Sequence, residues 1–315
     1  MDSAHAITTE ESGRLTRRVT ALSVATAGVL TALKVGVWLA TGSVAILASM
    51  ADSGLDLLAA LATFWAVRYA ASPPDAEHRY GHGKAEAFAS LVQAGLVFAS
   101  AALIGQEAIR HFIAPRPLQH EAWGVAAMAI STVLTGGLIY AQTQVLKQTR
   151  SVAVTGDRAH YLADLASNIA ALIAIAATAL LGIGGFDALG GLVVAGVLLW
   201  GAVSVFRQAS GELMDHELPD DARAKIVALM TADPRLTDVH QLRTRASGPI
   251  VHIQMHADLD PELSLETAHE VVVAAEKRVL EAFPAADIII HPDPRGRAEP
   301  HGGAFAETYE PAQSG

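Results

Sequence analysis

Ser49-Met50-Ala51-Asp52-Ser53-Gly54-Leu55-Asp56 lies inside one apolar run of the chain, and Ala159-His160-Tyr161-Leu162-Ala163-Asp164-Leu165 lies inside another. Each segment places two ionisable side chains four residues apart. In an α-helix this spacing puts both members of a pair on one face, one turn apart. The two segments therefore predict two apolar helices that each carry an ionisable pair.

Six apolar runs fill the first two-thirds of the chain. A helix needs about 20 apolar residues to cross the hydrocarbon core of a bilayer, and each run is near or above that length. A membrane β-barrel would show shorter, alternating segments. We therefore predict an all-α, six-helix transmembrane domain over residues 15–208, after an N-terminal tail of residues 1–14. The runs cover residues 17–40, 43–69, 87–110, 121–145, 152–182 and 186–207.

Composition and charge divide the chain in two. Of 315 residues, 51% are hydrophobic, the mean hydropathy is +0.34, and the formal net charge is −10. Residues 1–208 hold 13 basic and 13 acidic residues, whereas residues 209–315 hold 9 and 19. The acidic balance argues against nucleic acid as a partner. The absence of cysteine excludes disulfides, thiolate metal sites and a catalytic thiol.

Basic residues in the loops predict the orientation, because they favour the cytoplasmic side. Most basic residues flanking the runs fall on the side that holds both chain ends, and the opposite side has only Arg110 and Arg116. We therefore expect a multi-pass protein of the bacterial inner membrane with both termini in the cytoplasm.

The two ionisable pairs predict a cation site. An isolated charge in the middle of a span costs at least about 2.5–3.5 kcal/mol. Three carboxylates and one imidazole, from Asp52, Asp56, His160 and Asp164, can bind a divalent cation in the tetrahedral geometry that zinc prefers. The alternative is a set of structural hydrogen bonds facing a water-filled crevice. Lys34, in the first run, has no partner at helical spacing, so a structural ion pair or a chain reaching to the interface is expected there.

The pairs, the six runs and the segment Tyr80-Gly81-His82-Gly83-Lys84-Ala85-Glu86 resemble the cation diffusion facilitator family, above all its bacterial zinc and ferrous-iron exporters. The resemblance covers residues 15–293. It implies proton-coupled export of a divalent metal from the cytoplasm. It also implies a homodimer formed through the cytoplasmic domain and the third span.

The loop between the second and third runs has a second candidate metal site. Asp75, His78 and His82 are spaced three and four residues apart, so they could converge on one ion, and the alternative is a solvated polar loop. The resemblance implies a metal site here too. Ala76 stands where some relatives carry a second carboxylate, which would weaken the site. The resemblance also suggests an inter-domain salt bridge between Lys84 and Asp215.

The remaining chain predicts a linker over 209–218, a small cytoplasmic α+β domain over 219–293 and a disordered tail over 294–315. The predicted order is αββαβ, and the resemblance implies a metallochaperone-like, dimerising fold. Ser247-Gly248-Pro249 is a turn signal between two strands. The predicted elements are helices at 219–232 and 264–283 and strands at 238–246, 250–259 and 287–291.

Several histidines of this domain suit a regulatory zinc site, and the alternative for each one alone is a surface residue. The resemblance selects a set, and Pro292 stands where relatives carry a further ligand. His252 has no counterpart in the resemblance and is expected at the surface. The selected residues are His240, His256, His269, His291 and Asp293.

The sequence leaves the metal open. One imidazole among three carboxylates fits Zn²⁺ and also permits Fe²⁺, Mn²⁺, Cd²⁺ or Co²⁺. A membrane metal hydrolase is a rival, but no nucleophile and no HExxH-type motif accompanies the ligands. A metal sensor that does not transport is another, and it would not need the pairs inside the spans. The expected activity is thus secondary transport rather than catalysis, with metal ions and protons as the ligands and the lipid bilayer as the surroundings.

Overall fold

The computed structural model describes residues 8–41, 44–113, 122–181 and 186–296. The chain forms two compact units. One comprises residues 11–213, and the other comprises residues 214–315 together with residues 1–10. The predicted tail over 294–315 lies mostly outside the described residues.

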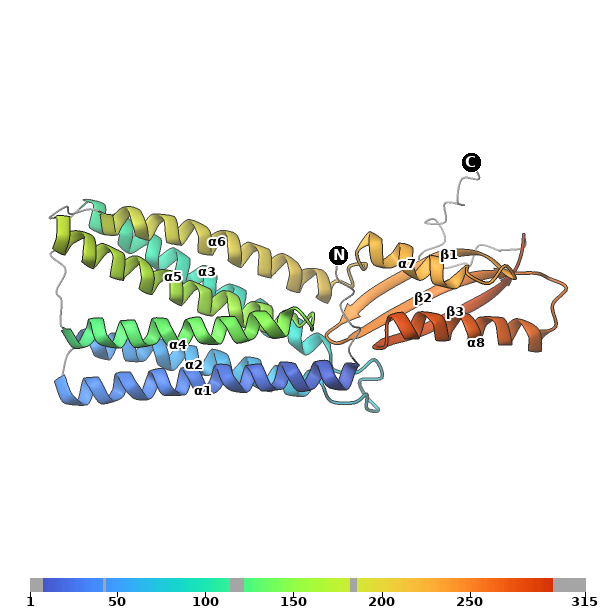
Figure 1. The fold of residues 1–315 in the computed structure, drawn as a ribbon, viewed down its shortest axis with the longest axis horizontal. Coiled ribbons are helices and arrows are strands. Elements are labelled where there is room, and N and C mark those ends of the chain that lie inside the picture. The colour runs from blue at the N-terminus through green and yellow to red at the C-terminus, as the bar shows by residue number, and fades with distance from the viewer. Residues whose placement is uncertain (1–7, 42–43, 114–121, 182–185, 297–315) are drawn as a thin grey trace. The chain divides into compact units, whose positions relative to one another are not determined.

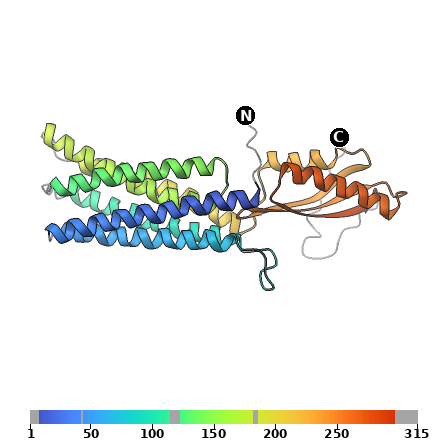
Figure 2. The same cartoon turned by 60° about the horizontal axis from the view of Figure 1, so that its bottom comes forward.

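Long helices make up the first unit, and Figures 1 and 2 show them running alongside one another. The first begins at Thr9, inside the predicted tail, and the last continues to Leu213, so the first half of the predicted linker is helical. In the described residues the helices are α1 (Thr9–Thr41), α2 (Val44–Ala70), α3 (Lys84–Ile113), α4 (Ala122–Leu146), α5 (Val152–Leu181) and α6 (Phe186–Leu213).

Three of these helices are long and apolar enough to cross a membrane, within the residues that the structure describes. They cover Glu10–Ala40, Lys84–Arg110 and Leu189–Leu213. The structure describes a helix for each of the six predicted spans. Judged on the described residues alone, three of the six are long and apolar enough to cross a membrane. Helices α2 and α5 carry the ionisable pairs within their sequences.

Helix α3 packs against α2, α5 and α6, and α5 also packs against α4 and α6. Small side chains allow this close contact, as expected for helices that associate in lipid. Ala101, Ala163 and Ala202 form a buried cluster with Val97 and Leu198, so α3, α5 and α6 share one core.

The second unit has the predicted αββαβ order. Strand β2 lies between the others: it pairs antiparallel with β1 and parallel with β3. The parallel pair needs a crossover, which α8 provides. Gly248 has a φ of 56°, a left-handed conformation that glycine adopts at little cost in the turn before β2. The elements are α7 (Asp220–Met230), β1 (Leu236–Ser247), β2 (Ile250–Leu259), α8 (Leu265–Ala282) and β3 (Ala286–Pro294).

Apolar residues at helical spacing bury one face of α8 against the sheet. Val271, Ala275 and Val279 recur every four residues and are fully buried against Ile253 of β2. Ser264 caps this helix by accepting a hydrogen bond from the backbone N–H of Thr267, at the start predicted from the sequence.

A glycine of α5 sets the distance between α5 and α3. A Cβ added at Gly156 would lie 2.6 Å from Ser90 Oγ and 3.0 Å from its Cα, whereas a Cβ at Gly137 would meet nothing within 4 Å. We predict that Gly156→Val destabilises the protein by about 1–3 kcal/mol, because α3 must move aside. Thermal unfolding in detergent should show a clear loss for Gly156→Val and little for Gly137→Val. Equal unfolding temperatures would contradict the prediction.

Candidate metal sites

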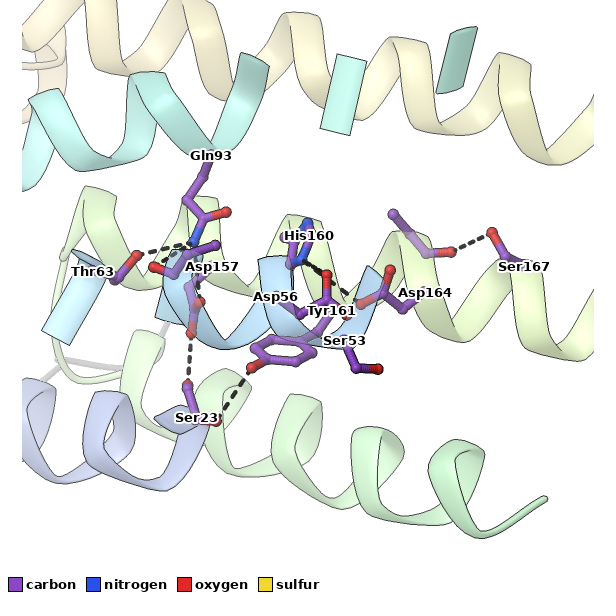
Figure 3. A network of polar contacts seen from close by, with 12 residues as sticks. Ser23, Ser53, Asp56, Thr63, Gln93, Asp157, His160, Tyr161, Asp164 and Ser167 are labelled. Carbon is purple, nitrogen blue, oxygen red and sulfur yellow. Dashed lines mark hydrogen bonds and ion pairs between the residues drawn. The ribbon is translucent and has the colours of Figure 1, made fainter. Parts of the chain in front are cut away.

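Asp56 of α2 meets His160 and Asp164 of α5 inside the helical unit (Figure 3). His160 Nε2 lies 3.1 Å from Asp56 Oδ1 and 3.8 Å from Asp164 Oδ2. His160 is nearly buried, and both carboxylates are partly buried. Ligand atoms of the three residues lie within 4.8 Å of one another, close enough to hold one metal ion. The structure therefore brings together three of the four predicted ligands.

Asp52 belongs to α2, one turn before Asp56. Its side chain lies outside the described residues. Its place on the helix is consistent with the same face as Asp56. Its role as the fourth ligand stays a prediction.

The three ligands line a cavity of about 430 Å³. Polar side chains share its wall with apolar ones, and Lys34, Ser53 and Asn168 are among them. His160 Nδ1 is buried and has no hydrogen-bond partner among the described residues. Imidazole, carboxylate and hydroxyl groups around one cavity are the kinds of ligand that could replace the water shell of a divalent cation.

A buried carboxylate that the sequence reasoning missed lies one turn before His160. Asp157 Oδ2 accepts hydrogen bonds from Ser23 Oγ at 2.6 Å and from Gln142 Nε2 at 2.8 Å. Gln93 Nε2 lies 3.4 Å from Asp157 Oδ1 and donates to Thr63 Oγ1 at 3.0 Å. These contacts connect α5 to α1, α3 and α4, and Figure 3 shows those with Ser23 of α1 and Gln93 of α3. An acid three residues before His160 was the signal that could have found it.

The loop triad also comes together. Asp75 lies 3.2 Å from His78 Nδ1 through one carboxylate oxygen and 3.2 Å from His82 Nε2 through the other. The backbone N–H of His78 donates to Asp75 and lowers the pKa of that carboxyl, which keeps it ionised for a cation. Ala76 provides no ligand, so the described group has three members.

Lys84 and Asp215 each have other contacts within their own units. Lys84 Nζ donates to the carbonyl of Leu213 at 3.3 Å. Asp215 lies 3.3 Å from Arg245 NH1. The two residues belong to different units, so their salt bridge stays a prediction.

Strand register builds the cytoplasmic site. His240, His256 and His291 occupy paired positions on β1, β2 and β3, so the three rings lie side by side across the sheet. Asp293 joins them: its Oδ2 lies 3.2 Å from His240 Nε2 and 2.8 Å from His256 Nδ1, and its Oδ1 lies 3.2 Å from His291 Nε2. Four of the five predicted residues therefore cluster, although Pro292 offers no ligand.

His269 is exposed on α8 and is not among the residues grouped around Asp293 in the described chain. Its role as a ligand stays a prediction.

The surface prediction for His252 is wrong. His252 is buried, and its Nδ1 lies 3.0 Å from Asp287 Oδ2 because the two residues face each other in the β2–β3 register. Its partner lies on the neighbouring strand, so the contact depends on the β2–β3 register and cannot be found from spacing along one strand.

The sequence reasoning also missed Asp258. Its Oδ1 lies 3.9 Å from His240 Nδ1, on the ring edge away from Asp293. Burial raises the pKa of this carboxyl. Asp258 thus adds a carboxylate beside the histidine cluster.

We predict that Asp157→Leu destabilises the helical unit, because Ser23 and Gln142 lose a buried acceptor at about 1–3 kcal/mol each. Asp157→Asn keeps a carbonyl oxygen and should lose less. Tryptophan fluorescence during thermal unfolding in detergent measures the difference. Equal stability of the two variants would contradict the network.

We predict that Asp293→Ala removes at least one zinc ion per chain, because this carboxylate contacts all three clustered histidines. Asp287→Ala, on the same strand, is the matched control and should leave the count unchanged. Equilibrium dialysis of the full-length protein with zinc, followed by metal analysis, gives the stoichiometry. An unchanged count in Asp293→Ala would overturn the assignment.

Comparison with known proteins agrees with both units. The model of the cation efflux transmembrane domain matches residues 20–214, and that of the cation efflux protein cytoplasmic domain matches residues 218–295. The cation-efflux pump FieF of Cronobacter sakazakii is 38% identical over 282 residues, which cover 90% of this chain and 94% of that protein. FieF of Serratia proteamaculans is 37% identical over 281 residues, which cover 89% and 93%. The chain therefore belongs to the cation efflux, or cation diffusion facilitator, family of membrane transporters.

Proposed function

We propose that this protein is a proton-coupled antiporter that exports divalent metal ions, chiefly Zn²⁺ and also Fe²⁺, from the cytoplasm. The observation that carries the proposal is the contact of His160 with Asp56 and Asp164 inside an apolar helical unit. Ionisable groups are costly within a membrane and are retained there for function. Asp52 completes the set as the fourth ligand.

The ligands come from two helices, which suits alternating access. In this mechanism six spans cross the bacterial inner membrane, and α2 and α5 present the site first to the cytoplasm and then to the other side. The ion leaves the cytoplasm without its water, because carboxylates and imidazole replace its hydration shell. Proton uptake on the other side then competes with the metal for the same atoms.

His160 is the natural proton acceptor of this cycle, because histidine ordinarily changes charge near neutral pH. Its Nε2 faces both described carboxylates, so a proton there takes the place of the metal. Metal binding on one side and proton binding on the other would thus alternate at the same atoms.

The cytoplasmic unit would serve dimerisation and metal sensing. It carries the acidic excess of the chain together with the histidine cluster around Asp293. Metal ions bound there would reduce repulsion between two copies. The FieF relatives are named cation-efflux pumps, which supports export over sensing alone.

We predict that Asp56→Asn and His160→Ala each reduce zinc-driven proton movement at least tenfold. Asn lacks the negative charge of Asp56, and Ala lacks the imidazole of His160, so each change weakens metal binding at the candidate site. Everted membrane vesicles with an imposed pH gradient would be mixed with Zn²⁺, Fe²⁺, Mn²⁺ or Cd²⁺. A pH-sensitive dye would follow the protons, and metal analysis would follow the metal ion.

Glu107→Gln is the matched control, because this carboxylate on α3 is exposed and contacts Arg110 outside the cavity. It should transport at the rate of the unmodified protein. Metal-driven proton movement that survives in Asp56→Asn and His160→Ala would refute the site. A rate of metal uptake that does not change with the pH gradient would refute the coupling of metal export to protons.

A further inference from the structure

A lysine shares the cavity with the candidate metal ligands. Lys34 of α1 lines the same space as Asp56, His160 and Asp164. Its Nζ donates to Ser53 Oγ at 2.6 Å. Ser53 is buried on α2, between the two aspartates of the first ionisable pair.

The ammonium group points into the bundle and not toward the end of its helix. Lys34 lies seven residues before the end of α1, and Ser53 lies nine residues after the start of α2. At 1.5 Å per residue these positions are about 10 Å and about 13 Å from the connected helix ends. A lysine that reached for the interface would extend the other way. Thr31 Oγ1 also contacts Ser53, at its carbonyl, so this stretch of α1 is held against α2.

The positive charge of Lys34 indicates its role in the cavity. With His160 neutral, Asp56 and Asp164 bring two negative charges to the cavity and Lys34 brings one positive charge. Asp52, the proposed fourth ligand, would add a third negative charge. The balance of two negative charges is what one divalent cation cancels. Without Lys34, the empty site would hold a larger excess of negative charge in surroundings that screen it weakly.

We infer that Lys34 is the built-in counter-ion of the metal cavity: its ammonium competes with the divalent ion, lowers the affinity of the site and so allows release. The inference rests on the proposed function, because it takes the Asp56–His160–Asp164 cluster as the transport site. Ser53 holds the ammonium group in the wall of the cavity that the carboxylates also line, and the entering metal ion repels it electrostatically. Lys34 therefore sets the affinity and is not itself a ligand.

The chain has no cysteine, so a cysteine introduced at position 34 can be labelled selectively to vary the charge at that position. Lys34→Cys gives a single thiol that can be modified in two ways. Aminoethyl methanethiosulfonate restores a cation of nearly the length of lysine, and methyl methanethiosulfonate leaves the position neutral. These variants are made in protein that also carries His78→Ala and Asp293→Ala. The two changes disrupt the loop cluster and the cytoplasmic cluster, so the cavity is the predicted site that remains.

Zinc titration of the full-length protein in detergent gives Kd, and reconstituted vesicles give KM and Vmax. We expect the neutral form to bind Zn²⁺ about tenfold more tightly than the cationic form and to turn over more slowly, since release becomes limiting. Lys34→Arg should follow the unmodified protein. Lys34→Met is a second neutral variant and should also combine lower KM with lower Vmax. Arg18→Met removes an exposed charge from the same helix and should change neither.

Equal or weaker zinc affinity of the neutral forms, in protein with an unaltered unfolding temperature, would overturn the inference. Asp56→Asn separates this failure from failure of the proposed function. If Asp56→Asn abolishes zinc binding while the two labels give the same Kd, the role of Lys34 is refuted alone. If Asp56→Asn binds zinc normally, the transport site itself is refuted.

Discussion

The contact between His160 and Asp56 is the interaction on which the helical unit depends. It joins α5 to α2 through ionisable groups inside an apolar helical unit, where an unpartnered charge is costly. Such groups must find partners, so the two helices are restricted to one rotation and one depth. The contact that restricts the packing also forms part of the candidate cation site. Under the proposed function, stability and transport are therefore linked at the same atoms.

Polar groups continue away from this contact, each held by a partner on another helix. Asp157 connects α5 to three further helices, and Lys34 connects α1 to α2 through Ser53. Unsatisfied polar groups cost several kcal/mol in lipid, so such contacts specify which helices are neighbours. Small residues complete the arrangement: Gly156 lets α5 approach Ser90 of α3. The apolar surface places these helices in the membrane, and the polar contacts fix their order.

The cytoplasmic unit builds its candidate metal site by a different geometry. There the ligands do not follow helical spacing along one segment. They come from paired positions on three neighbouring strands, with Asp293 bridging the rings. All four clustered side chains come from this sheet, so the candidate site needs only the sheet among the described elements. This independence fits a domain that would report metal concentration separately from the transport cycle.

Spacing along the chain was enough to predict the helices of the ionisable pairs, the αββαβ order and the loop triad around Asp75. Helical and strand periods act over a few residues, so these features are local properties of the sequence. Only the tertiary structure decided that His252 is buried against Asp287, that Asp157 gathers donors from three other helices and that Lys34 turns toward Ser53. These contacts join segments far apart in the chain and depend on strand register and helix rotation. No local period contains that information, because each contact is fixed by the packing of both elements at once.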